Sequence, residues 1–315
     1  MRNFFIYIFI FLSFLFSQEE IGVGLVEDSL INYLQNFYTT SSTLGYTPAR
    51  EILYGEIDNS NGYVTCVYTN YSGQVQGSNN LISQLYDQGI NCEHLWPQSL
   101  GSGDEPMRSD MHHLRPCKDN VNSVRSNNPF GEINDYVTDT WFWLEYSSNS
   151  IPQNNIDQYS ESASNIFEPR EDVKGDIARA MFYFYTIYDN VANDSFFNGQ
   201  KEVLYQWHLD DPVINSEIDR TWAIASYQND IPNPFILDNT LIYRAYFYEE
   251  DNNQWTIGDV TQDGIVNIVD IVLIVNYVLN TQTLNDTQLE IADINMDGIV
   301  NIVDIVALVS IIIGD

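Results

Sequence analysis

Basic residues are scarce in this sequence of 315 residues. Twelve lysines and arginines stand against 44 aspartates and glutamates, for a formal net charge of −32. A protein that holds polyanions or anionic membranes by general electrostatic attraction needs a basic surface, so the composition excludes that class. Any contact with a polyanion must be local and assisted by bound metal. Because 44% of the residues are hydrophobic and 14% are aromatic, the shortage of lysine does not indicate disorder.

Long apolar runs are also missing. Residues 4–16 are thirteen apolar or nearly apolar residues, well short of the roughly 20 that span a bilayer. This run follows the short charged start Met1–Asn3 and precedes the small Ser17 and a polar stretch. A secretory signal peptide over residues 1–17 is therefore a better interpretation than a membrane anchor. We expect a secreted protein, extracellular or periplasmic, with no membrane partner.

Cysteine is rare. In an exported protein, the three cysteines allow one disulfide and one free thiol. We expect Cys66 to pair with Cys92, because both lie in strand-like runs and the bond would brace the strand that carries Glu93 and His94. Cys117 is the rival partner, and the spacing alone does not decide between them.

The cations that the chain does have are concentrated between residues 91 and 127. This stretch holds three of the four histidines and four of the twelve basic residues. The basic side chains are those of Arg108, Arg115, Lys118 and Arg125. An acidic chain that gathers cations in one place indicates an anionic ligand at that place.

The side chains of this stretch suit the hydrolysis of a phosphodiester. That reaction needs a base to activate water, a metal ion to neutralise charge on the phosphate, and cations for the transition state. A neutral imidazole is the natural base near pH 7, and His94 supplies one. Mg²⁺ keeps several waters and takes one or two protein oxygens, which Glu93 and Asn122 can provide.

The coarse structure places these residues on two strands and a helix. We expect strands over residues 89–94 and 110–115, and a helix over residues 119–127. Neighbouring residues on a regular strand face opposite ways. Glu93 and His94 must therefore lie at a strand end or flank the phosphate from different sides, and the sequence leaves both arrangements open.

Hydrophobic patterns predict further elements on both sides of this stretch. The expected helices cover residues 30–37, 47–54, 81–86, 174–185, 202–208 and 217–227, and an expected strand covers residues 63–68. Residues 147–165 are rich in serine, asparagine and glutamine, and we expect a loop there.

Several segments resemble the endonuclease I family of the ββα-metal, or His-Me finger, nucleases. The resemblance is carried by residues 92–99, 109–114, 121–127, 129–131, 175–180 and 207–213, and covers most of residues 28–240. It implies an α+β fold with a ββα-metal finger core and surrounding helices. It also implies His94 as general base, one catalytic Mg²⁺ on Glu93 and Asn122, and an arginine that steadies the phosphate. Such enzymes cut DNA, and often RNA, with little sequence preference.

The resemblance does not identify the phosphate-binding arginine. Arg108 lies two residues before Asp110, which is closer to the second strand than the family pattern. Arg115 and Arg125 are the other candidates, and a surface ion pair is the alternative role for Arg125. We take Arg108 and Arg125 as the expected catalytic cations.

The C-terminal region contains an internal repeat. Residues 263–272 recur letter for letter as residues 297–306, and residues 256–315 carry nine acidic side chains and no basic one. Each copy places oxygen ligands and a glycine at the spacing of a twelve-residue calcium loop. The expected calcium ligands are Asp259, Thr261, Asp263, Ile265, Asn267 and Asp270 in the first loop, and Asp293, Asn295, Asp297, Ile299, Asn301 and Asp304 in the second, with the isoleucines acting through backbone carbonyls.

Two such loops, each followed by an apolar helix over residues 268–279 or 302–313, resemble the type I dockerin family. The resemblance implies a small all-α domain over residues 257–315 that folds on two Ca²⁺ ions. It also implies a cohesin-type protein partner, because the apolar helices would otherwise lie exposed. A calcium-stabilised cap without a partner is the alternative.

These observations predict a secreted, Mg²⁺-dependent endonuclease of low sequence specificity, acting on DNA and in the alternative on RNA. The expected parts are a signal peptide at 1–17, a nuclease domain at 18–250, a linker at 251–256 and a dockerin-like domain at 257–315. A catalytically inactive binding or scaffold protein, which associates through the dockerin-like domain, is the competing class.

Overall fold

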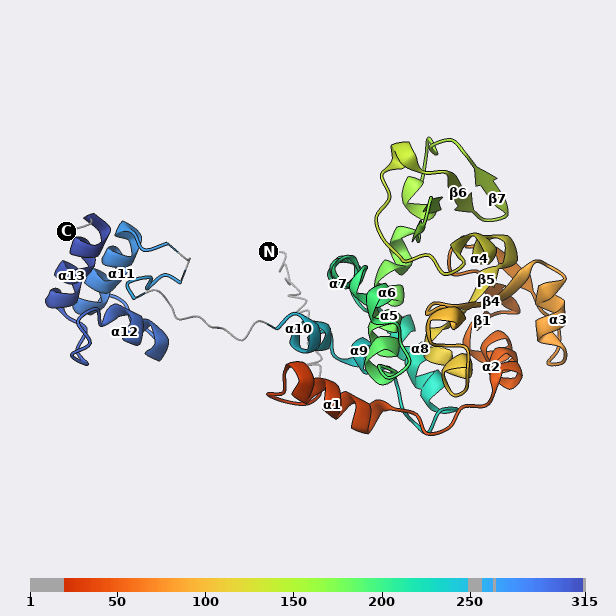
Figure 1. Cartoon of the computed structure of the whole chain (residues 1–315), viewed down its shortest axis with the longest axis horizontal. Helices are drawn as coiled ribbons and strands as arrows, with labels where there is room; N and C mark the ends of the chain where they lie inside the picture. The colour runs from red at the N-terminus through yellow and green to blue at the C-terminus, as the bar shows by residue number, and fades with distance from the viewer. Residues whose placement is uncertain (1–19, 249–256, 263–264, 314–315) are drawn as a thin grey trace, which may run out of the picture. The chain divides into compact units, whose positions relative to one another are not determined.

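The chain divides after Tyr248 into two compact units in this computed structural model (Figure 1). The structure describes residues 20–248, 257–262 and 265–313. The predicted signal peptide, the predicted linker and the expected calcium ligand Asp263 lie outside these ranges. Within them, no helix is both long enough and apolar enough to cross a bilayer.

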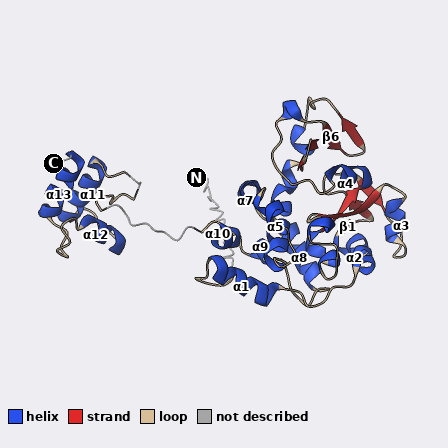
Figure 2. Cartoon of the chain, in the orientation of Figure 1, coloured by secondary structure: helices blue, strands red, loops and turns tan. Residues whose placement is uncertain are grey.

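The first unit is mostly helical, with short strands between the helices (Figure 2). Its helices are α1 (Glu27–Tyr38), α2 (Tyr46–Ile52), α3 (Leu81–Tyr86), α4 (Asp119–Arg125), α5 (Lys174–Ile187), α6 (Asp194–Asn198), α7 (Lys201–Asp210), α8 (Asn215–Ala225), α9 (Pro234–Leu237) and α10 (Leu241–Tyr246). Its strands are β1 (Asn59–Ser60), β2 (Tyr63–Thr65), β3 (Ser72–Gln74), β4 (Ile90–His94), β5 (Leu114–Lys118), β6 (Thr140–Trp143), β7 (Tyr146–Ser148), β8 (Ser160–Ala163) and β9 (Ile166–Glu168).

The strands form three small antiparallel sheets, ordered β1–β2–β3, β4–β5 and β7–β6–β8–β9. Small antiparallel sheets beside separate helices make an α+β fold, so the expected fold class is confirmed. The helices expected on hydrophobic periodicity are present with bounds that differ by a few residues, and the expected strand over residues 63–68 is shorter, as β2.

Helix α5 is the centre of the larger core. Twelve of its fourteen residues are buried, as its nearly uniform apolar character predicted. It contacts α1, α7 and α9. Trp96, in the loop after β4, stacks on Phe184 of α5 with ring centroids 4.8 Å apart. The loop that follows β4 is thereby anchored to the most buried helix.

Strand β4 separates two clusters of buried side chains. Ile90 and Cys92 pack in the smaller cluster with residues of α2, α3 and β5. Glu93 faces the other way, toward Tyr68 of the larger cluster. Because successive side chains of a strand alternate between its faces, this one strand serves both cores.

The second strand of the β4–β5 hairpin begins later in the sequence than expected. Residues 111–113 form a 3₁₀ turn and β5 covers Leu114–Lys118, so the strand predicted over 110–115 is wrong in its bounds. The buried carboxylate of Asp110 is the cause. It accepts hydrogen bonds from the amide of His112 and from two tyrosine hydroxyls. A side chain that caps the backbone two residues on favours a turn over an extended strand.

The prediction of a loop over residues 147–165 is also wrong, because this segment contains β8 and part of β7. Strand β8 pairs with β6 and β9 through its backbone, and polar side chains do not prevent such pairing. The hydroxyl of Ser160 is buried and donates a hydrogen bond of 2.7 Å to the carbonyl of Tyr68. The polar composition suggested an exposed loop, but the tertiary structure provides a buried hydrogen-bond partner for a side chain such as Ser160.

The predicted disulfide between Cys66 and Cys92 is not present. All three cysteines are buried and free. Cys92 lies in the smaller core cluster, on the opposite face of β4 from the larger cluster that contains Cys66 and Cys117. The Sγ atoms of Cys66 and Cys117 are 4.0 Å apart, which makes the rival partner the nearer one.

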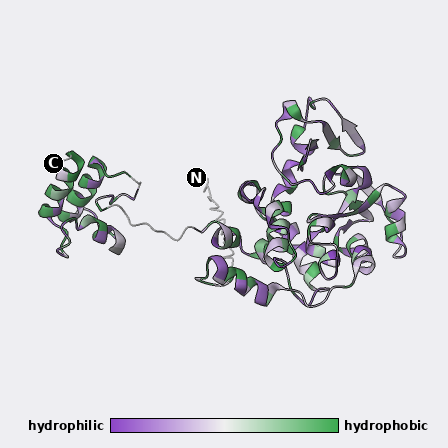
Figure 3. Cartoon of the chain, viewed as in Figure 1, coloured by the Kyte–Doolittle hydropathy of each residue, from purple (hydrophilic) through white to green (hydrophobic). Residues whose placement is uncertain are grey.

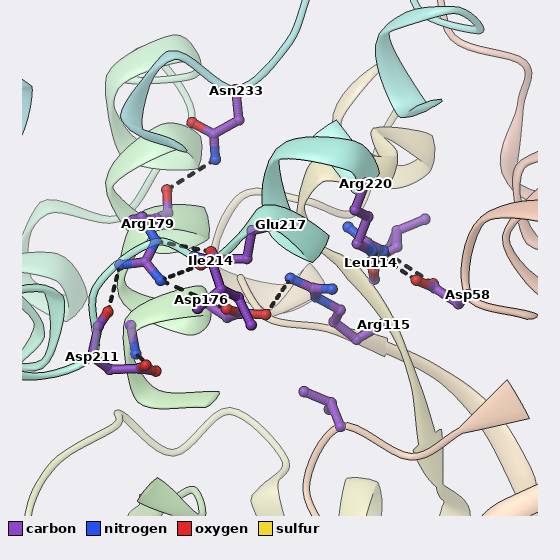
Figure 4. Close-up of polar contacts among 12 residues, drawn as sticks. Asp58, Leu114, Arg115, Asp176, Arg179, Asp211, Ile214, Glu217, Arg220 and Asn233 are labelled. Carbon is purple, nitrogen blue, oxygen red and sulfur yellow. Dashed lines mark hydrogen bonds and ion pairs between the residues drawn. The ribbon is translucent and has the colours of Figure 1, made fainter. Parts of the chain in front are cut away.

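Ion pairs between buried or half-buried side chains tie β5 to the helices beside it (Figure 4). Arg115 of β5 contacts Asp176 of α5 at 3.1 Å. Arg179, also on α5, donates hydrogen bonds of 2.9 and 2.7 Å to Glu217 of α8. Buried charges are costly unless they are paired. These pairs therefore hold β5, α5 and α8 in one arrangement.

A third arginine in this network reaches the hairpin directly. Arg220 of α8 forms an ion pair of 2.7 Å with Asp58 and donates a hydrogen bond of 2.9 Å to the carbonyl of Leu114. Leu114 pairs with His94 across the hairpin. The network thus supports the backbone opposite His94.

The second unit contains α11 (Ile268–Val278), α12 (Asp286–Ala292) and α13 (Ile302–Ile313). Helices α11 and α13 follow the two loops, as expected, and contact each other, while the short α12 was not expected. The apolar core is small and consists of Val260, Ile274, Ile291, Ala292 and Leu308. Much of the apolar surface of α11 and α13, coloured green in Figure 3, remains exposed.

Candidate active site

Strands β4 and β5 and helix α4 form a ββα unit at the place that the sequence predicted. The strands pair with His94 opposite Leu114 and Glu93 opposite Arg115. Strand β4 ends at His94. Of the two arrangements that the sequence left open, the structure has the one in which Glu93 and His94 lie at a strand end.

A pocket of about 420 Å³ opens at this strand end. Its lining residues are Cys92, Glu93, His94, Pro97, Gln98, Ser99, Asn122, Ser126 and Asn127. The three residues expected to act on a phosphodiester, Glu93, His94 and Asn122, therefore meet in one cavity, although they come from two different elements.

Glu93 is buried and held by two neighbours. Its Oε1 accepts a hydrogen bond of 2.7 Å from the Tyr68 hydroxyl and lies 3.3 Å from Nη1 of Arg125. Burial raises the pKa of Glu93 to about 7, against the lowering effects of Arg125 and of the Tyr68 hydrogen bond. A further cation beside this carboxylate would favour its ionised form.

His94 is oriented by the backbone of Arg108. Its Nε2 lies 2.9 Å from the Arg108 carbonyl, and because a carbonyl only accepts, Nε2 carries the proton. The other ring nitrogen, Nδ1, then has the lone pair, and Nε2 of Gln98 lies 3.3 Å from it. Burial lowers the pKa of His94 to about 3, with His113, Arg108 and Arg50 acting in the same direction. The imidazole is therefore neutral near pH 7 and can accept a proton at Nδ1.

The side-chain amide of Asn122 is oriented by its nitrogen. Nδ2 donates hydrogen bonds of 2.7 Å to Oδ1 of Asn91 and 3.2 Å to the carbonyl of Cys92. A backbone carbonyl cannot donate, so the nitrogen must face it and the amide oxygen must point elsewhere. Asn122 lines the pocket, which makes its Oδ1 available as a second hard oxygen ligand.

This donor set fits one hard divalent cation. Mg²⁺ takes one or two protein oxygens and keeps several waters, and Glu93 and Asn122 supply one carboxylate and one amide oxygen at the same cavity. Among the residues that the structure describes, no three His, Cys, Asp or Glu side chains gather into a larger metal-binding group.

The structure does not bear out the phosphate contact predicted for Arg125. Its side chain is fully buried, and its guanidinium donates to the carbonyls of His94 and Leu95 and contacts Glu93. The alternative role, a surface ion pair, is correct about the pair, which Arg125 forms with Glu93, and wrong about its place, because the pair is buried. Helix α4 packs its last turn against β4, and Arg125 braces that contact from inside.

Of the three candidate arginines, Arg108 is the one with an exposed side chain. Arg115 is committed to its ion pair with Asp176. The guanidinium of Arg108 lies over the ring of Tyr46, 4.8 Å from the ring centroid. Tyr46 in turn lies beside His94, with ring centroids 5.2 Å apart.

Two of the residues around His94 were missed in the sequence. Tyr46 and Arg50, four residues apart on α2, come from a segment far from residues 91–127, and the guanidinium of Arg50 lies 4.1 Å from the Tyr46 ring centroid. An aromatic and a cation at this spacing share one helix face, which was the available signal. Nothing local connects that face with His94.

The twelfth-place aspartates of the C-terminal loops have the same partners in both copies. Asp270 accepts hydrogen bonds from the amides at the third and ninth places of its loop, and Asp304 does the same in the second loop. Both carboxylates are fully buried. The two loops thus share these backbone hydrogen bonds, even at the third place, where their residues differ.

The ninth-place asparagines cap the helices that follow. Oδ1 of Asn267 accepts from the amide of Val269 at the start of α11, and its Nδ2 donates to the Ile265 carbonyl. Asn301 makes the equivalent bonds at the start of α13. The expected ligands at the seventh and ninth places therefore also connect each loop with its helix.

The other expected ligands lie at the start of each loop. In the second loop, the carboxylate of Asp293 accepts from the amides of Asp297 and Gly298, and Asn295 donates to Asp297 at 2.9 Å. In the first, Asp259 is buried and Thr261 donates to Asp270 at 2.8 Å. Oxygen donors on short turns are the type of ligand that Ca²⁺ takes.

Two protein-family models match the chain. The endonuclease I model matches residues 27–240, and the dockerin type I domain model matches residues 257–312. The first match contains the pocket at the end of β4, and the second contains both loops and most of α13.

Two curated relatives are similar to part of the chain. An extracellular ribonuclease of Bacillus subtilis (strain 168) is 34% identical over 162 residues, and an extracellular ribonuclease of Bacillus amyloliquefaciens is 30% identical over 166 residues. Each alignment covers 46% of this chain and 50% of the relative. The chain thus spans about half the length of the curated relatives that it matches.

Proposed function

The chain belongs to the endonuclease I family and carries a C-terminal type I dockerin domain, and on that premise we propose that it is an exported endonuclease that depends on a divalent metal. The observation that carries this proposal is the meeting of His94, Glu93 and Asn122 in one pocket. A neutral imidazole beside two hard oxygen ligands is the equipment that phosphodiester hydrolysis requires.

The base in this proposal is Nδ1 of His94. The Arg108 carbonyl keeps the proton on Nε2, so Nδ1 accepts a proton from the attacking water. The water oxygen bonds to phosphorus, and the bond from phosphorus to the 3′-oxygen breaks on the opposite side. The departing 3′-oxygen takes a proton from a water molecule, and a 5′-phosphate end is left. A bound phosphate is anionic and raises the pKa of the ring toward the working range.

Glu93 and Asn122 hold the metal, which we take to be a single Mg²⁺. When bound, such an ion neutralises charge on the phosphate as a Lewis acid. Arg125 and Tyr68 keep the Glu93 carboxylate in place, and Asn91 does the same for the Asn122 amide. The exposed guanidinium of Arg108 adds positive charge beside His94.

The proposed substrates are RNA and DNA. The names of the two relatives favour RNA, which the sequence alone offered only as the alternative to DNA. A site that acts on phosphate and backbone has little means of reading bases, so low sequence specificity is part of the proposal. An enzyme restricted to RNA is the second candidate, and the relatives' names are the observation that favours it.

The dockerin domain is proposed to fold on two Ca²⁺ ions and to bind a cohesin-type partner. Equivalent side chains of the two repeats are exposed to nearly the same extent: Ile268 by 69% and Ile302 by 63%, Val272 by 52% and Val306 by 60%. Exposed apolar side chains in matched positions favour an interface over a cap without a partner. The apolar run at residues 4–16 supports export.

Turnover of a supercoiled plasmid and of a long single-stranded RNA, with Mg²⁺ and with EDTA, tests the proposed activity. We expect cleavage of both with Mg²⁺ and of neither with EDTA. Cleavage of RNA alone would select the ribonuclease, and full activity in EDTA would remove the metal from the mechanism. If neither substrate were cleaved, the competing assignment would be favoured, a binding or scaffold protein that associates through its dockerin domain.

A further inference from the structure

The basic side chains of this acidic protein are almost all neutralised within the fold. Eleven of the twelve basic residues lie in the described ranges. Eight of them form ion pairs with carboxylates: Arg115, Arg125, Arg170, Lys174, Arg179, Lys201, Arg220 and Arg244. In the described part of the chain, Arg50, Arg108 and Lys118 are the three without one.

Two of these three unpaired cations lie at one tyrosine ring. The guanidinium carbons of Arg50 and Arg108 are 4.1 and 4.8 Å from the centroid of Tyr46. The Tyr46 ring is 5.2 Å from the ring of His94. Both cations also lower the pKa of His94, as positive charges close to the ring must.

This placement has no structural explanation in ion pairing. Like charges repel, and a chain with 44 acidic residues has carboxylates to spare for both arginines. Within the residues described, the terminal Nη atoms of Arg50 and Arg108 make no hydrogen bond to protein. The ring holds the two guanidinium groups in place and leaves these donors for a ligand.

We propose that Arg50, held over Tyr46 beside Arg108, binds a phosphate of the nucleic-acid strand next to the one that is cleaved. The inference rests on the proposed function, since it assigns a second phosphate to the same strand. The backbone carbonyl of Arg108 contacts His94, so Arg108 is assigned to the reacting phosphate. Arg50, which contacts the same tyrosine ring from α2, is assigned to the neighbouring phosphate.

A guanidinium suits this task better than an ammonium group. Its planar N–H donors match phosphate oxygens in pairs, while its face can remain over an aromatic ring. A local pair of such cations also explains how a protein with a net charge of −32 could bind a polyanion. The proposed contact is confined to the phosphates nearest His94 and needs no general basic surface.

Lys118 provides a matched control. It also lacks an ion pair, and its Nζ lies 4.1 Å from the centroid of Tyr71. It pairs with Ile90 at the other end of the β4–β5 hairpin from His94. Lys118→Ala therefore removes the same kind of charge and contact without reaching the pocket.

The kinetic test compares Arg50→Ala with the full-length protein on single-stranded RNA. We expect KM to rise about tenfold with kcat within about twofold, because binding that is equal in ground and transition states is lost. The plot of log(kcat/KM) against log salt concentration should become shallower by about 0.7, the value of one phosphate contact on a single strand. Arg50→Lys should retain part of the affinity, and Lys118→Ala should match the parent in all three quantities.

Equilibrium binding gives a second readout that needs no turnover. In a His94→Gln background, Arg50→Ala should weaken binding of a fluorescent single-stranded octanucleotide about tenfold, with the same loss of salt dependence. A fall in kcat or in melting temperature, with KM, octanucleotide affinity and salt slope unchanged, would make Arg50 a structural residue and overturn the inference. Absence of cleavage by the parent protein would overturn the proposed function instead, and the binding comparison would still decide the role of Arg50.

Discussion

The pocket at the end of β4 is lined from β4, from α4 and from the loop between β4 and β5, whereas each C-terminal loop takes its oxygens from twelve consecutive residues. In the pocket, Glu93 and Asn122 are held by other protein groups, Arg125, Tyr68 and Asn91. In the loops, the expected ligands hold one another. The first arrangement is braced by side chains from several elements of the fold, and the second has little beyond its own twelve residues to support it.

The hydrophobic cores of the two units also differ, and the core of the second unit is the smaller one. The first unit buries tryptophan, phenylalanine and tyrosine side chains around α5, while the second buries five small or aliphatic residues in its central cluster. Domains below about 70 residues rarely gain enough from such a core and need metals or disulfides. The comparison teaches that, in the proposed function, one metal would supply chemistry to a fold that other contacts already stabilise, and the other would complete a fold.

Removal of calcium should have the largest effect on this comparison. Treatment with EGTA should unfold the dockerin domain, because the binding free energy of a metal to such a small domain is folding free energy. The nuclease domain should keep its melting temperature. Circular dichroism and limited proteolysis with mass spectrometry check both halves. A dockerin domain that resists protease without calcium would erase the contrast.

Replacement of the base should come next. His94→Gln should lower kcat by about 10²–10⁴-fold, the usual contribution of general base catalysis, without changing the melting temperature. His208, whose Nε2 lies 3.0 Å from the Asn239 carbonyl, is the matched histidine outside the pocket. His208→Gln should keep kcat. Equal losses in the two variants would show that His94 acts through the fold.

Removal of the buried cation that braces Glu93 should cost stability. Arg125→Met leaves the buried carboxylate of Glu93 without its ion pair, and we expect the free energy of unfolding to fall by about 3–5 kcal/mol. Lys201→Met removes an exposed pair with Glu202 and should cost about 0–1 kcal/mol. Urea denaturation of the nuclease domain measures both. A cost for Arg125→Met as small as that of the control would mean that the pair does not support the pocket.

The smallest expected effect is the loss of stability at low pH that comes from the buried carboxylate of Asp110. Burial opposes ionisation of Asp110, but His112, His113 and the hydrogen bonds from Gln228 and Tyr188 outweigh it and lower its pKa. Its contribution to stability is therefore complete above the unfolded pKa near 3.8 and is lost as pH falls through the lower folded pKa.

Urea unfolding of the nuclease domain from pH 7 to pH 2.5 measures this contribution. Asp110→Asn should make the acid side of the stability curve shallower. The dockerin domain should fail at higher pH, because protons compete with calcium for its carboxylates. Loss of both domains at one pH would contradict the difference between them.

Some of the candidate site followed from residue types and short spacings. The proposed ligand and base roles of Glu93, His94 and Asn122 needed only their chemistry and the resemblance of the segments around them. The order strand, strand, helix could also be predicted, because each segment has a local pattern. The bounds of β5 could not, since the turn before it depends on a buried Asp110 whose partners lie on α5 and beyond.

The arginines show where local reasoning ends. Arg108, Arg115 and Arg125 are close in the sequence and alike in charge, yet one is exposed, one is paired with Asp176 and one is sealed against Glu93. Arg50 lies more than forty residues from His94 and shares a tyrosine with Arg108. Charge can be counted along a chain, but neutralisation is decided by which segments pack together.

The sequence by itself determined the chemistry available and the two expected metal-binding patterns, because imidazole, carboxylate and amide groups keep their donor and acceptor atoms wherever they stand and a twelve-residue loop closes on itself. Only the tertiary structure decided which cations remain free, which cysteines are neighbours and on which side of β4 each group lies. Those outcomes depend on burial and on contacts between distant segments, and a buried charge or thiol acquires its partner only when the core closes around it.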